Sequence, residues 1–143
     1  MKQQEKVQKI NCLSNDMNAL YHLAARKLGV SDSALCVLYL IYEKGDHCRL
    51  YDICAESGIS KQTINSAIRN LEREEILYLE QDTGRTKRIC LTEKGKAYIA
   101  RTGARLYETE NRIFQSWPEE EFELYLKLME KYNHDLREEI EKM

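Results

Sequence analysis

The chain has 143 residues, of which 43% are hydrophobic and 32% charged, with one proline, six glycines and a formal net charge of −2. This length fits one domain that buries roughly two-thirds of the surface exposed on unfolding, so the chain can fold without disulfides or metals. No stretch approaches the roughly 20 apolar residues that span a bilayer, and residues 1–10 carry no signal-peptide core, so we expect a cytoplasmic protein with no membrane partner.

Two helices are predicted in the first third of the chain. From Ile10 to Leu28, apolar residues recur every three or four positions, which is the stripe of an amphipathic helix, and Gly29 ends it. Ser31 or Ser33 can cap a second helix, whose residues 35–42 are apolar almost all round. The second helix is therefore expected at the centre of the core.

Two further helices follow. A short one is predicted from Leu50 to Glu56, with Gly58 as its stop, and Ser60 caps the next. The capped helix has a mostly apolar face with Thr63, Ile64, Ala67, Ile68 and Leu71, and a polar face with Lys61, Gln62, Asn65, Ser66 and Arg69. Nothing in the pattern requires the polar set to pack inward.

A β-hairpin and two more helices are predicted after residue 75. Strand-like runs at 76–80 and 87–91 flank a link that contains Gly84. Thr92 caps a helix whose spacing continues through Ile113, and Pro118 opens the last helix, about 119–142. This last helix carries a seam with a period near 3.5, which favours packing along another long helix: Phe122, Tyr125, Met129, Tyr132 and Leu136.

Charge is distributed unevenly along the chain. Residues 44–105 hold 12 Lys and Arg against 9 Asp and Glu, whereas residues 116–143 hold 4 against 9. The middle of the chain could therefore meet phosphate, whereas the C-terminal segment could not. An acidic, solvated helix face also explains the C-terminal part, so the asymmetry permits nucleic-acid binding without proving it.

Residues 52–71 have the pattern of a helix-turn-helix: a short helix, a tight turn at Gly58 and a second helix opened by Ser60. Amide side chains on the second helix can pair with adenine, and Arg69 with guanine, while Lys61 suits phosphate. Arg85, Lys87 and Arg88 lie at or beside the hairpin tip, where a projecting arm could reach the minor groove. A solvated helix face and a merely charged hairpin are the alternatives.

Three segments resemble the MarR family of regulators: Gly58-Ile-Ser-Lys-Gln-Thr-Ile, Leu71-Glu-Arg-Glu-Glu-Ile-Leu, and Arg-Ile-Cys-Leu-Thr-Glu-Lys-Gly at residues 88–95. The resemblance implies a mainly α (α+β) winged helix-turn-helix, in which residues 31–96 bind DNA and the helices of 1–30 and 97–143 form a homodimer. It implies a transcriptional regulator, most often a repressor, that binds double-stranded DNA at a pseudo-palindromic operator. The candidate DNA contacts are Ser60, Lys61, Gln62, Thr63, Asn65, Ser66, Arg69, Arg85, Lys87 and Arg88.

Two positions depart from the family pattern. Wings of the family commonly carry Asp-x-Arg, but the matching triplet here is Thr83-Gly84-Arg85, so the acid that often braces the arginine is absent. Many members have a glycine after the recognition helix, where this chain has Glu75.

The resemblance also implies control of DNA affinity, by a small aromatic effector or by cysteine oxidation. Tyr21, His22 and Arg26 on the first helix, with Tyr39 and Tyr42 on the second, could line an effector cleft. Aromatic residues at helical spacing also serve as core, so the sequence does not choose between these roles. A redox-sensing regulator of the same fold and a winged-helix adaptor that does not bind DNA remain alternatives.

Cysteine and histidine usage excludes several other classes of site. The five cysteines include no C-x-x-C pair, and we expect most of them, Cys12 included, to be small buried hydrophobes. His47 and Cys48 are the only adjacent soft metal ligands, so neither a metal nor a cofactor is predicted. The sequence has no Gly-x-Ser-x-Gly motif, no phosphate-binding glycine loop and no His-Glu-x-x-His motif, and it has only three histidines for acid–base chemistry. The chain is therefore not expected to be an enzyme.

Overall fold

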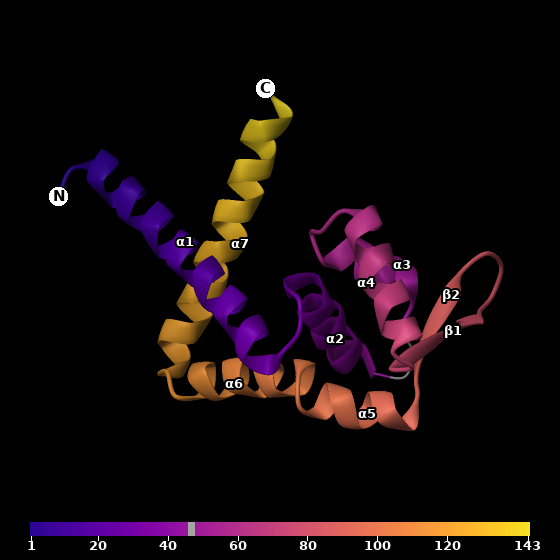
Figure 1. The fold of residues 1–143 in the computed structure, drawn as a ribbon. Coiled ribbons are helices and arrows are strands. Elements are labelled where there is room, and N and C mark those ends of the chain that lie inside the picture. The colour runs from indigo at the N-terminus through magenta and orange to yellow at the C-terminus, as the bar shows by residue number, and fades with distance from the viewer. Residues whose placement is uncertain (46–47) are drawn as a thin grey trace. The chain divides into compact units, whose positions relative to one another are not determined.

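The computed structural model describes residues 1–45 and 48–143, which form two compact units, Met1–Tyr107 and Glu108–Met143. Most of these residues are helical, and the strands form one two-stranded antiparallel sheet, as the sequence predicts. The elements follow in this order (Figure 1): α1 (Gln3–Leu28), α2 (Asp32–Lys44), α3 (Leu50–Glu56), α4 (Lys61–Arg73), β1 (Leu77–Gln81), β2 (Lys87–Leu91), α5 (Glu93–Ala100), α6 (Gly103–Gln115) and α7 (Glu119–Glu141).

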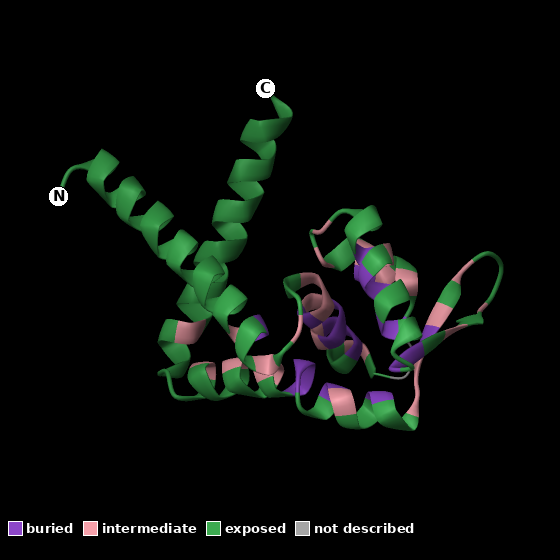
Figure 2. Ribbon diagram, in the orientation of Figure 1, coloured by how far each residue is buried: buried purple, intermediate pink, exposed green. Residues whose placement is uncertain are grey.

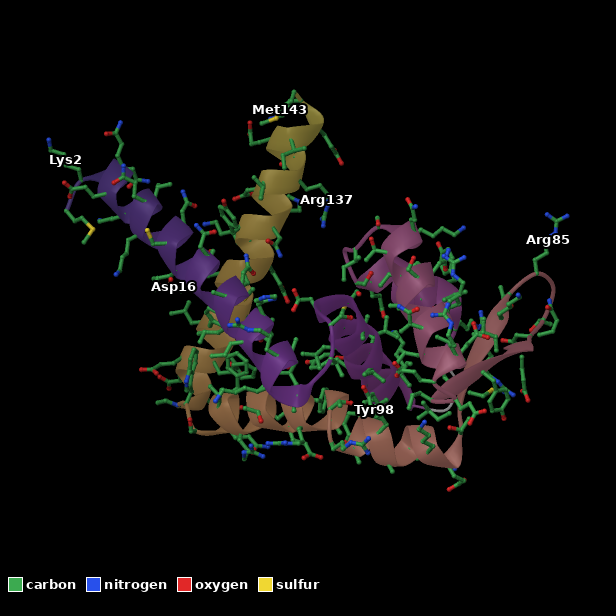
Figure 3. All side chains as sticks on the ribbon, viewed as in Figure 1. Lys2, Asp16, Arg85, Tyr98, Arg137 and Met143 are labelled. Carbon is green, nitrogen blue, oxygen red and sulfur yellow. The ribbon has the colours of Figure 1, made fainter. Side chains whose placement is uncertain are left out.

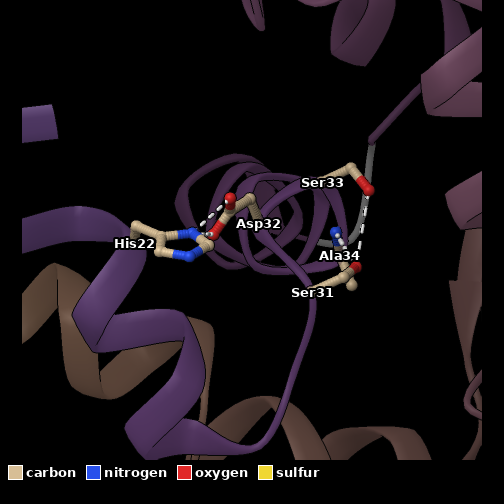
Figure 4. Close-up of polar contacts among 5 residues, drawn as sticks. All are labelled: His22, Ser31, Asp32, Ser33 and Ala34. Atoms are coloured by element: carbon tan, nitrogen blue, oxygen red, sulfur yellow. Dashed lines mark hydrogen bonds and ion pairs between the residues drawn. The ribbon is translucent and has the colours of Figure 1, made fainter. Parts of the chain in front are cut away.

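Local capping sets several helix boundaries where the sequence places them. The Ser31 hydroxyl accepts a 3.1 Å hydrogen bond from the Ala34 amide at the start of α2 (Figure 4). The Ser60 hydroxyl accepts one of 3.3 Å from the Thr63 amide at the start of α4. These bonds satisfy amides that have no partner inside the helix, so the predicted caps are confirmed.

The core of the first unit is built around α2. Figure 2 shows that the buried residues concentrate on α2, on one face of α4, at the start of the hairpin and on α5. Val37 and Leu38 of α2 and Ile53 of α3 are fully buried, as are Ile64 of α4 and Ile76 before β1. The apolar run at 35–42 therefore occupies the centre of the core, as predicted.

The hairpin pairs β1 with β2 so that Leu79 lies opposite Ile89 and Glu80 opposite Arg88. A third segment extends this sheet, because the Ile89 amide donates to the Cys48 carbonyl at 2.8 Å and Arg49 forms a bridge with Arg88. The chain just before α3 therefore lies along β2, which ties the helix-turn-helix to the hairpin.

One predicted helix is wrong: the stretch expected to run unbroken from Thr92 past Ile113 is two helices. The break falls at Thr102, which is buried and donates its hydroxyl to the Tyr98 carbonyl at 2.8 Å. Next to it, Gly103 packs against the backbone of α2, where a Cβ would lie 2.5 Å from the carbonyl carbon of Leu38. Only glycine allows this approach, so packing on α2 redirects the chain.

Helices α1 and α7 expose most of their length within one chain (Figure 2). Ala25 is the one buried residue of α1, and α7 has none. In the second unit, the seam residue Tyr125 packs with Phe114 and Trp117 at ring-centroid distances of 6.0 and 5.6 Å, and Phe114 packs in turn with the seam residue Phe122 at 4.6 Å. The rest of the α7 seam, from Met129 to Leu136, is exposed.

Candidate nucleic-acid interface

The α3 and α4 helices form the predicted helix-turn-helix. The turn between them contains Gly58 in the left-handed region, at φ 69°, which favours glycine. The Ile59 amide donates to the Ser57 hydroxyl at 3.1 Å, and Ile53 and Ile64 are both fully buried. Apolar contact therefore fixes the angle between the two helices, and the outer face of α4 is left for other partners.

The outer face of α4 is polar and accessible. Lys61, Gln62, Ser66 and Arg69 are exposed, and Asn65 is half-buried. Arg69 donates to the Ser66 hydroxyl at 3.4 Å, a weak contact that leaves most of the guanidinium donors available. The structure thus brings together, on one helix, the residues that the sequence selected for base contacts.

Thr63 does not belong to the apolar face on which the sequence pattern placed it. It is exposed, and its hydroxyl oxygen accepts a hydrogen bond from the Ser60 hydroxyl at 2.9 Å. Ala67 and Leu71, one and two turns further along the same side of α4, are buried, so this side of the helix is covered only after its first turn. The position of Thr63 instead suits the candidate DNA-contacting set.

The hairpin presents Arg85 at its tip. Figure 3 shows the Arg85 side chain pointing away from the strands, and both Arg85 and Lys87 are exposed. The turn is held by the Thr86 hydroxyl, which donates to the Thr83 carbonyl at 2.7 Å. Arg85 is therefore carried on an ordered loop.

The wing takes part in two ion pairs that the sequence did not suggest. Arg88 donates to Glu80 across the hairpin at 2.7 Å, and this hydrogen bond is the main reason that the pKa of Glu80 is lowered. Arg49, at the start of α3, lies 3.5 Å from Asp82. The pKa of Asp82 is also lowered, chiefly by a backbone hydrogen bond from Thr83 and in smaller part by the Arg49 charge.

These pairs separate the three wing cations by role. Arg88 is paired with Glu80 in the second register position from the turn, whereas Arg85 and Lys87 are exposed. A second acid of the wing, Asp82, lies 3.5 Å from Arg49 at the start of the helix-turn-helix. Arg49 is therefore a candidate interface residue that the sequence pattern did not single out. The one feature of the sequence that could have indicated it is a cationic residue directly before α3.

The five candidate effector residues fall into three settings. His22 of α1 contacts the carboxylate of Asp32 at the start of α2, with Nδ1 to Oδ2 at 2.6 Å (Figure 4). Tyr39 and Tyr42 of α2 pack against Tyr107 of α6, with ring centroids 5.6 and 5.4 Å away. Tyr21 and Arg26 are exposed on α1. Asp32 and Tyr107 were not singled out from the sequence, because only packing brings them to these residues.

Two of the cavities lined by described residues lie beside the DNA-binding elements. One of about 300 Å³ lies between the α1–α2 turn, α4 and α5, and its lining includes Asn70, Arg73 and Tyr98. The other, of about 550 Å³, lies between α2, β2 and α5. Of the candidate effector residues, Tyr42 lines the larger cavity.

The cysteines are less buried than expected. Cys48 is buried, and burial is the main reason that its pKa is raised to about 11. Cys36, Cys54 and Cys90 are half-buried, and Cys12 is exposed. The buried setting predicted for Cys12 is therefore wrong for the single chain, because nothing in its own chain covers that part of α1.

One group of possible metal ligands occurs within residues 1–45 and 48–143: His134, Asp135 and Glu138 on α7. All three are exposed, and both imidazole nitrogens already face carboxylates, at 3.4 Å for Asp135 and 3.5 Å for Glu138. Their arrangement is that of a solvated ion-pair cluster. His47, of the soft pair considered above, lies outside the described residues.

Comparison with known proteins identifies the fold. Residues 28–89 match the model of the MarR family. The structure of the MepR–DNA complex from Staphylococcus aureus is 22% identical, with a TM-score of 0.68 over 90% of this chain and 96% of that one. The transcription regulator MarR from Oenococcus oeni is 16% identical, with a TM-score of 0.68 over 89% of this chain and 97% of that one.

A third similar structure was solved with a ligand. PcaV from Streptomyces coelicolor, in complex with its natural ligand, is 16% identical, with a TM-score of 0.62 over 85% of this chain and 89% of that one. No curated protein matches the chain. Among the described helices, none combines the length and the apolar character that a membrane crossing requires.

Proposed function

Residues 28–89 are a module of the MarR family, and from this premise we propose that the chain is a sequence-specific DNA-binding transcriptional regulator rather than an enzyme. It acts as a homodimer on a pseudo-palindromic operator, most simply as a repressor. The exposed polar face of α4, beside a hairpin that carries Arg85 at its tip, is the observation on which this proposal rests. Residues 31–96 are the DNA-binding module, and the helices of 1–30 and 97–143 are the dimerisation frame.

The α4 face fits the major groove chemically. Gln62 and Asn65 offer paired donors and acceptors to adenine, and Arg69 offers two parallel donors to guanine. Ser60, Lys61, Thr63 and Ser66 surround them with hydroxyl and ammonium groups that suit phosphate oxygens. Base contacts then select the sequence, while phosphate contacts set the position of the helix.

The wing contributes at the flank of the site. Arg85 is placed to enter the adjacent minor groove, where a narrow A·T-rich groove attracts arginine, and Lys87 is placed for phosphate. Arg88 is paired with Glu80 through one nitrogen, and its other N–H donors suit a phosphate beside the wing.

A homodimer follows from the exposed apolar faces of α1 and α7. Leu13, Met17 and Leu20 of α1 are 54%, 42% and 64% exposed in the single chain, and Met129 and Leu136 of α7 are 43% and 41% exposed. Exposed large apolar residues that recur along one side of a helix are typical of a surface that packs against another chain. A two-fold dimer places two α4 helices on half-sites about one DNA turn apart, roughly 10 bp centre to centre.

We further propose that a small aromatic effector controls DNA affinity. PcaV, a protein of this fold, was solved in complex with its natural ligand, which supports a ligand site in this chain. In this chain, Tyr39, Tyr42 and Tyr107 form an aromatic cluster on α2 and α6, and His22 and Arg26 supply polar groups on α1. Because α2 packs against α4, a ligand at α2 can influence the helix that contacts DNA.

Exposure of Cys12 supports the redox-sensing alternative, because an oxidant can reach this thiol in the single chain. Cys48 fits that role poorly, since a thiol with a pKa of about 11 stays protonated near neutral pH. Replacing Cys12 by Ser separates the two forms of control. If peroxide releases the unmodified protein from DNA but not this variant, oxidation of Cys12 is the signal. We expect both proteins to respond alike.

Fluorescence anisotropy tests the proposed function directly. The full-length protein is titrated into a labelled duplex from upstream of its own coding region and into a scrambled duplex of the same composition, across a salt series. We expect the upstream duplex to bind at least about a thousandfold more tightly than the scrambled one. Equal, weak binding to both duplexes, with no site found in a randomised DNA pool, would favour the adaptor instead.

A further inference from the structure

The tip loop of the wing, residues 82–86, carries Arg85 on a closed turn. The Asp82 amide donates to the Thr86 carbonyl at 2.9 Å, and the Thr86 hydroxyl donates to the Thr83 carbonyl at 2.7 Å. The Arg85 side chain points away from the strands (Figure 3). These hydrogen bonds fix the shape of the tip loop, but they do not fix its position relative to α4.

An ion pair joins the tip loop to the helix-turn-helix. Asp82, the first residue of the tip loop, lies 3.5 Å from Nε of Arg49, the residue directly before α3. The Asp82 side chain is 29% exposed, so its attraction to Arg49 is screened less than that of a fully exposed pair. The neighbouring residue, Cys48, is joined to β2 by the hydrogen bond from the Ile89 amide. The wing and the start of α3 are therefore linked once through the backbone and once through side chains.

The backbone link does not by itself hold the tip loop in place. The paired strands end at Gln81 and Lys87, whereas the backbone link is at Ile89, two residues further into β2. A two-stranded ribbon twists strongly and is marginally stable by itself, so the position of its tip depends on further contacts. The pair of Asp82 with Arg49 lies at the start of the tip loop, where it limits this motion.

We propose that Arg49 and Asp82 are positioning residues for Arg85: their ion pair holds the tip loop relative to α4 and so sets where Arg85 meets the groove that flanks the α4 site. This inference rests on the proposed function, which assigns α4 to the major groove and Arg85 to the minor groove. An arginine in the minor groove responds to groove width, so a small displacement changes which flanking sequence it accepts. The pair therefore acts on flank preference and leaves the base contacts of α4 unchanged.

Two variants with the same change in charge separate positioning from net charge. Asp82→Asn and Glu56→Gln each remove one negative charge, and Glu56 pairs with Lys44 of α2 rather than with the wing. Charge alone predicts that both variants bind every duplex more tightly, whatever its flanks. Fluorescence anisotropy compares one operator with A·T-rich and with G·C-rich flanks. We expect Asp82→Asn to lose about twofold to fivefold of the wild-type preference for A·T-rich flanks, the range that an exposed ion pair allows, and Glu56→Gln to keep it.

The three residues should act as one unit on flank preference. In an Arg85→Ala background, and equally in an Arg49→Gln background, Asp82→Asn should cause no further loss, because the positioned group or the partner is already gone. The proposal is overturned if Asp82→Asn has its full effect in either background, if it changes flank preference no more than Glu56→Gln does, or if the wild type binds its operator selectively but ignores the flanks.

Amide hydrogen exchange of the full-length protein without DNA tests the positioning step separately. The Ile89 amide reports on the contact between the wing and the segment before α3, because it donates to the Cys48 carbonyl. We expect Asp82→Asn to speed its exchange, measured by NMR, by up to about fivefold and Glu56→Gln to leave it unchanged. Equal exchange in the wild type and in Asp82→Asn overturns the proposal. Faster exchange without selective binding to any duplex would overturn the proposed function instead, while the pair would still be shown to hold the wing.

Discussion

The side-chain hydroxyl of Thr92 donates a 2.6 Å hydrogen bond to the backbone carbonyl of Glu75, which lies 17 residues earlier in the chain. The same oxygen accepts the Gly95 amide at 2.9 Å and so caps α5. One side chain thus links the segment that follows α4 to the first turn of α5, and these two segments flank the hairpin.

Removing this hydroxyl should destabilise the fold. Thr92→Val keeps the shape of the side chain but loses both the cap and the bond to Glu75, so we expect the free energy of unfolding to fall by about 2 kcal/mol. Thr92→Ser keeps the hydroxyl and should lose less than half as much. Urea denaturation at one fixed protein concentration measures both changes. Equal losses for Val and Ser would show that the methyl group matters instead.

Glu75 occupies a backbone conformation that suits glycine. Its φ is 62°, whereas Glu74 beside it has φ −81°. A left-handed conformation costs a residue with a side chain roughly 1 to 2 kcal/mol, partly offset because glycine gains more freedom on unfolding. We expect Glu75→Gly to raise stability by up to about 1 kcal/mol and Glu74→Gly to lower it. Opposite signs in thermal unfolding of the two variants would confirm the strain; a loss in both would refute it.

The outer face of α4 should determine sequence preference. Replacing Gln62, Asn65 or Arg69 by Ala should cost about 1 to 3 kcal/mol on the best operator and relax the preference at particular base pairs. The cost on scrambled DNA should be smaller, since no specific base contact is lost there. Binding of each variant to a set of operators with single base changes measures this. Small losses of equal size on every duplex would mean that the face does not contact bases.

Lys61 should act through charge alone. As a phosphate contact, its replacement by Ala should weaken binding to operator and scrambled DNA alike, and should lower the slope of log affinity against log salt by about one unit per protomer. Lys127→Ala is the matched control, because it removes the same charge from the acidic helix α7. A salt slope that changes equally in both variants would assign the effect to net charge.

Disrupting the α7 seam should dissociate the proposed dimer. Leu136 lies on the seam, and Lys127, nine residues earlier, lies about half a turn round the helix on its opposite face. Leu136→Glu should give a monomer at micromolar concentration, because it buries a charge in an apolar interface, whereas Lys127→Glu should remain dimeric. Sedimentation equilibrium distinguishes these states, and circular dichroism checks that both variants stay helical. A dimer that tolerates Leu136→Glu would place the interface elsewhere.

The sequence by itself determined the features that depend on neighbours three or four residues away. The amphipathic stripes, the serine caps at Ser31 and Ser60, and the short helix from Leu50 to Glu56 all appear where the pattern predicts them. Their hydrogen bonds close within one helical turn, so residue types at fixed spacing suffice to specify them. The same local logic placed the polar residues of α4 together on its outer face.

Tertiary structure alone decided which distant groups meet. The contact of Gly103 with α2 divides a continuous helical pattern into α5 and α6, and no spacing within 92–113 signals it. Arg88 pairs with Glu80 because antiparallel pairing places the two residues opposite each other. Arg49 pairs with Asp82 because the bridge between Arg49 and Arg88 brings the start of α3 to the hairpin. The partners of a long side chain depend on which surfaces pack against it, and packing is a property of the whole fold rather than of any single segment.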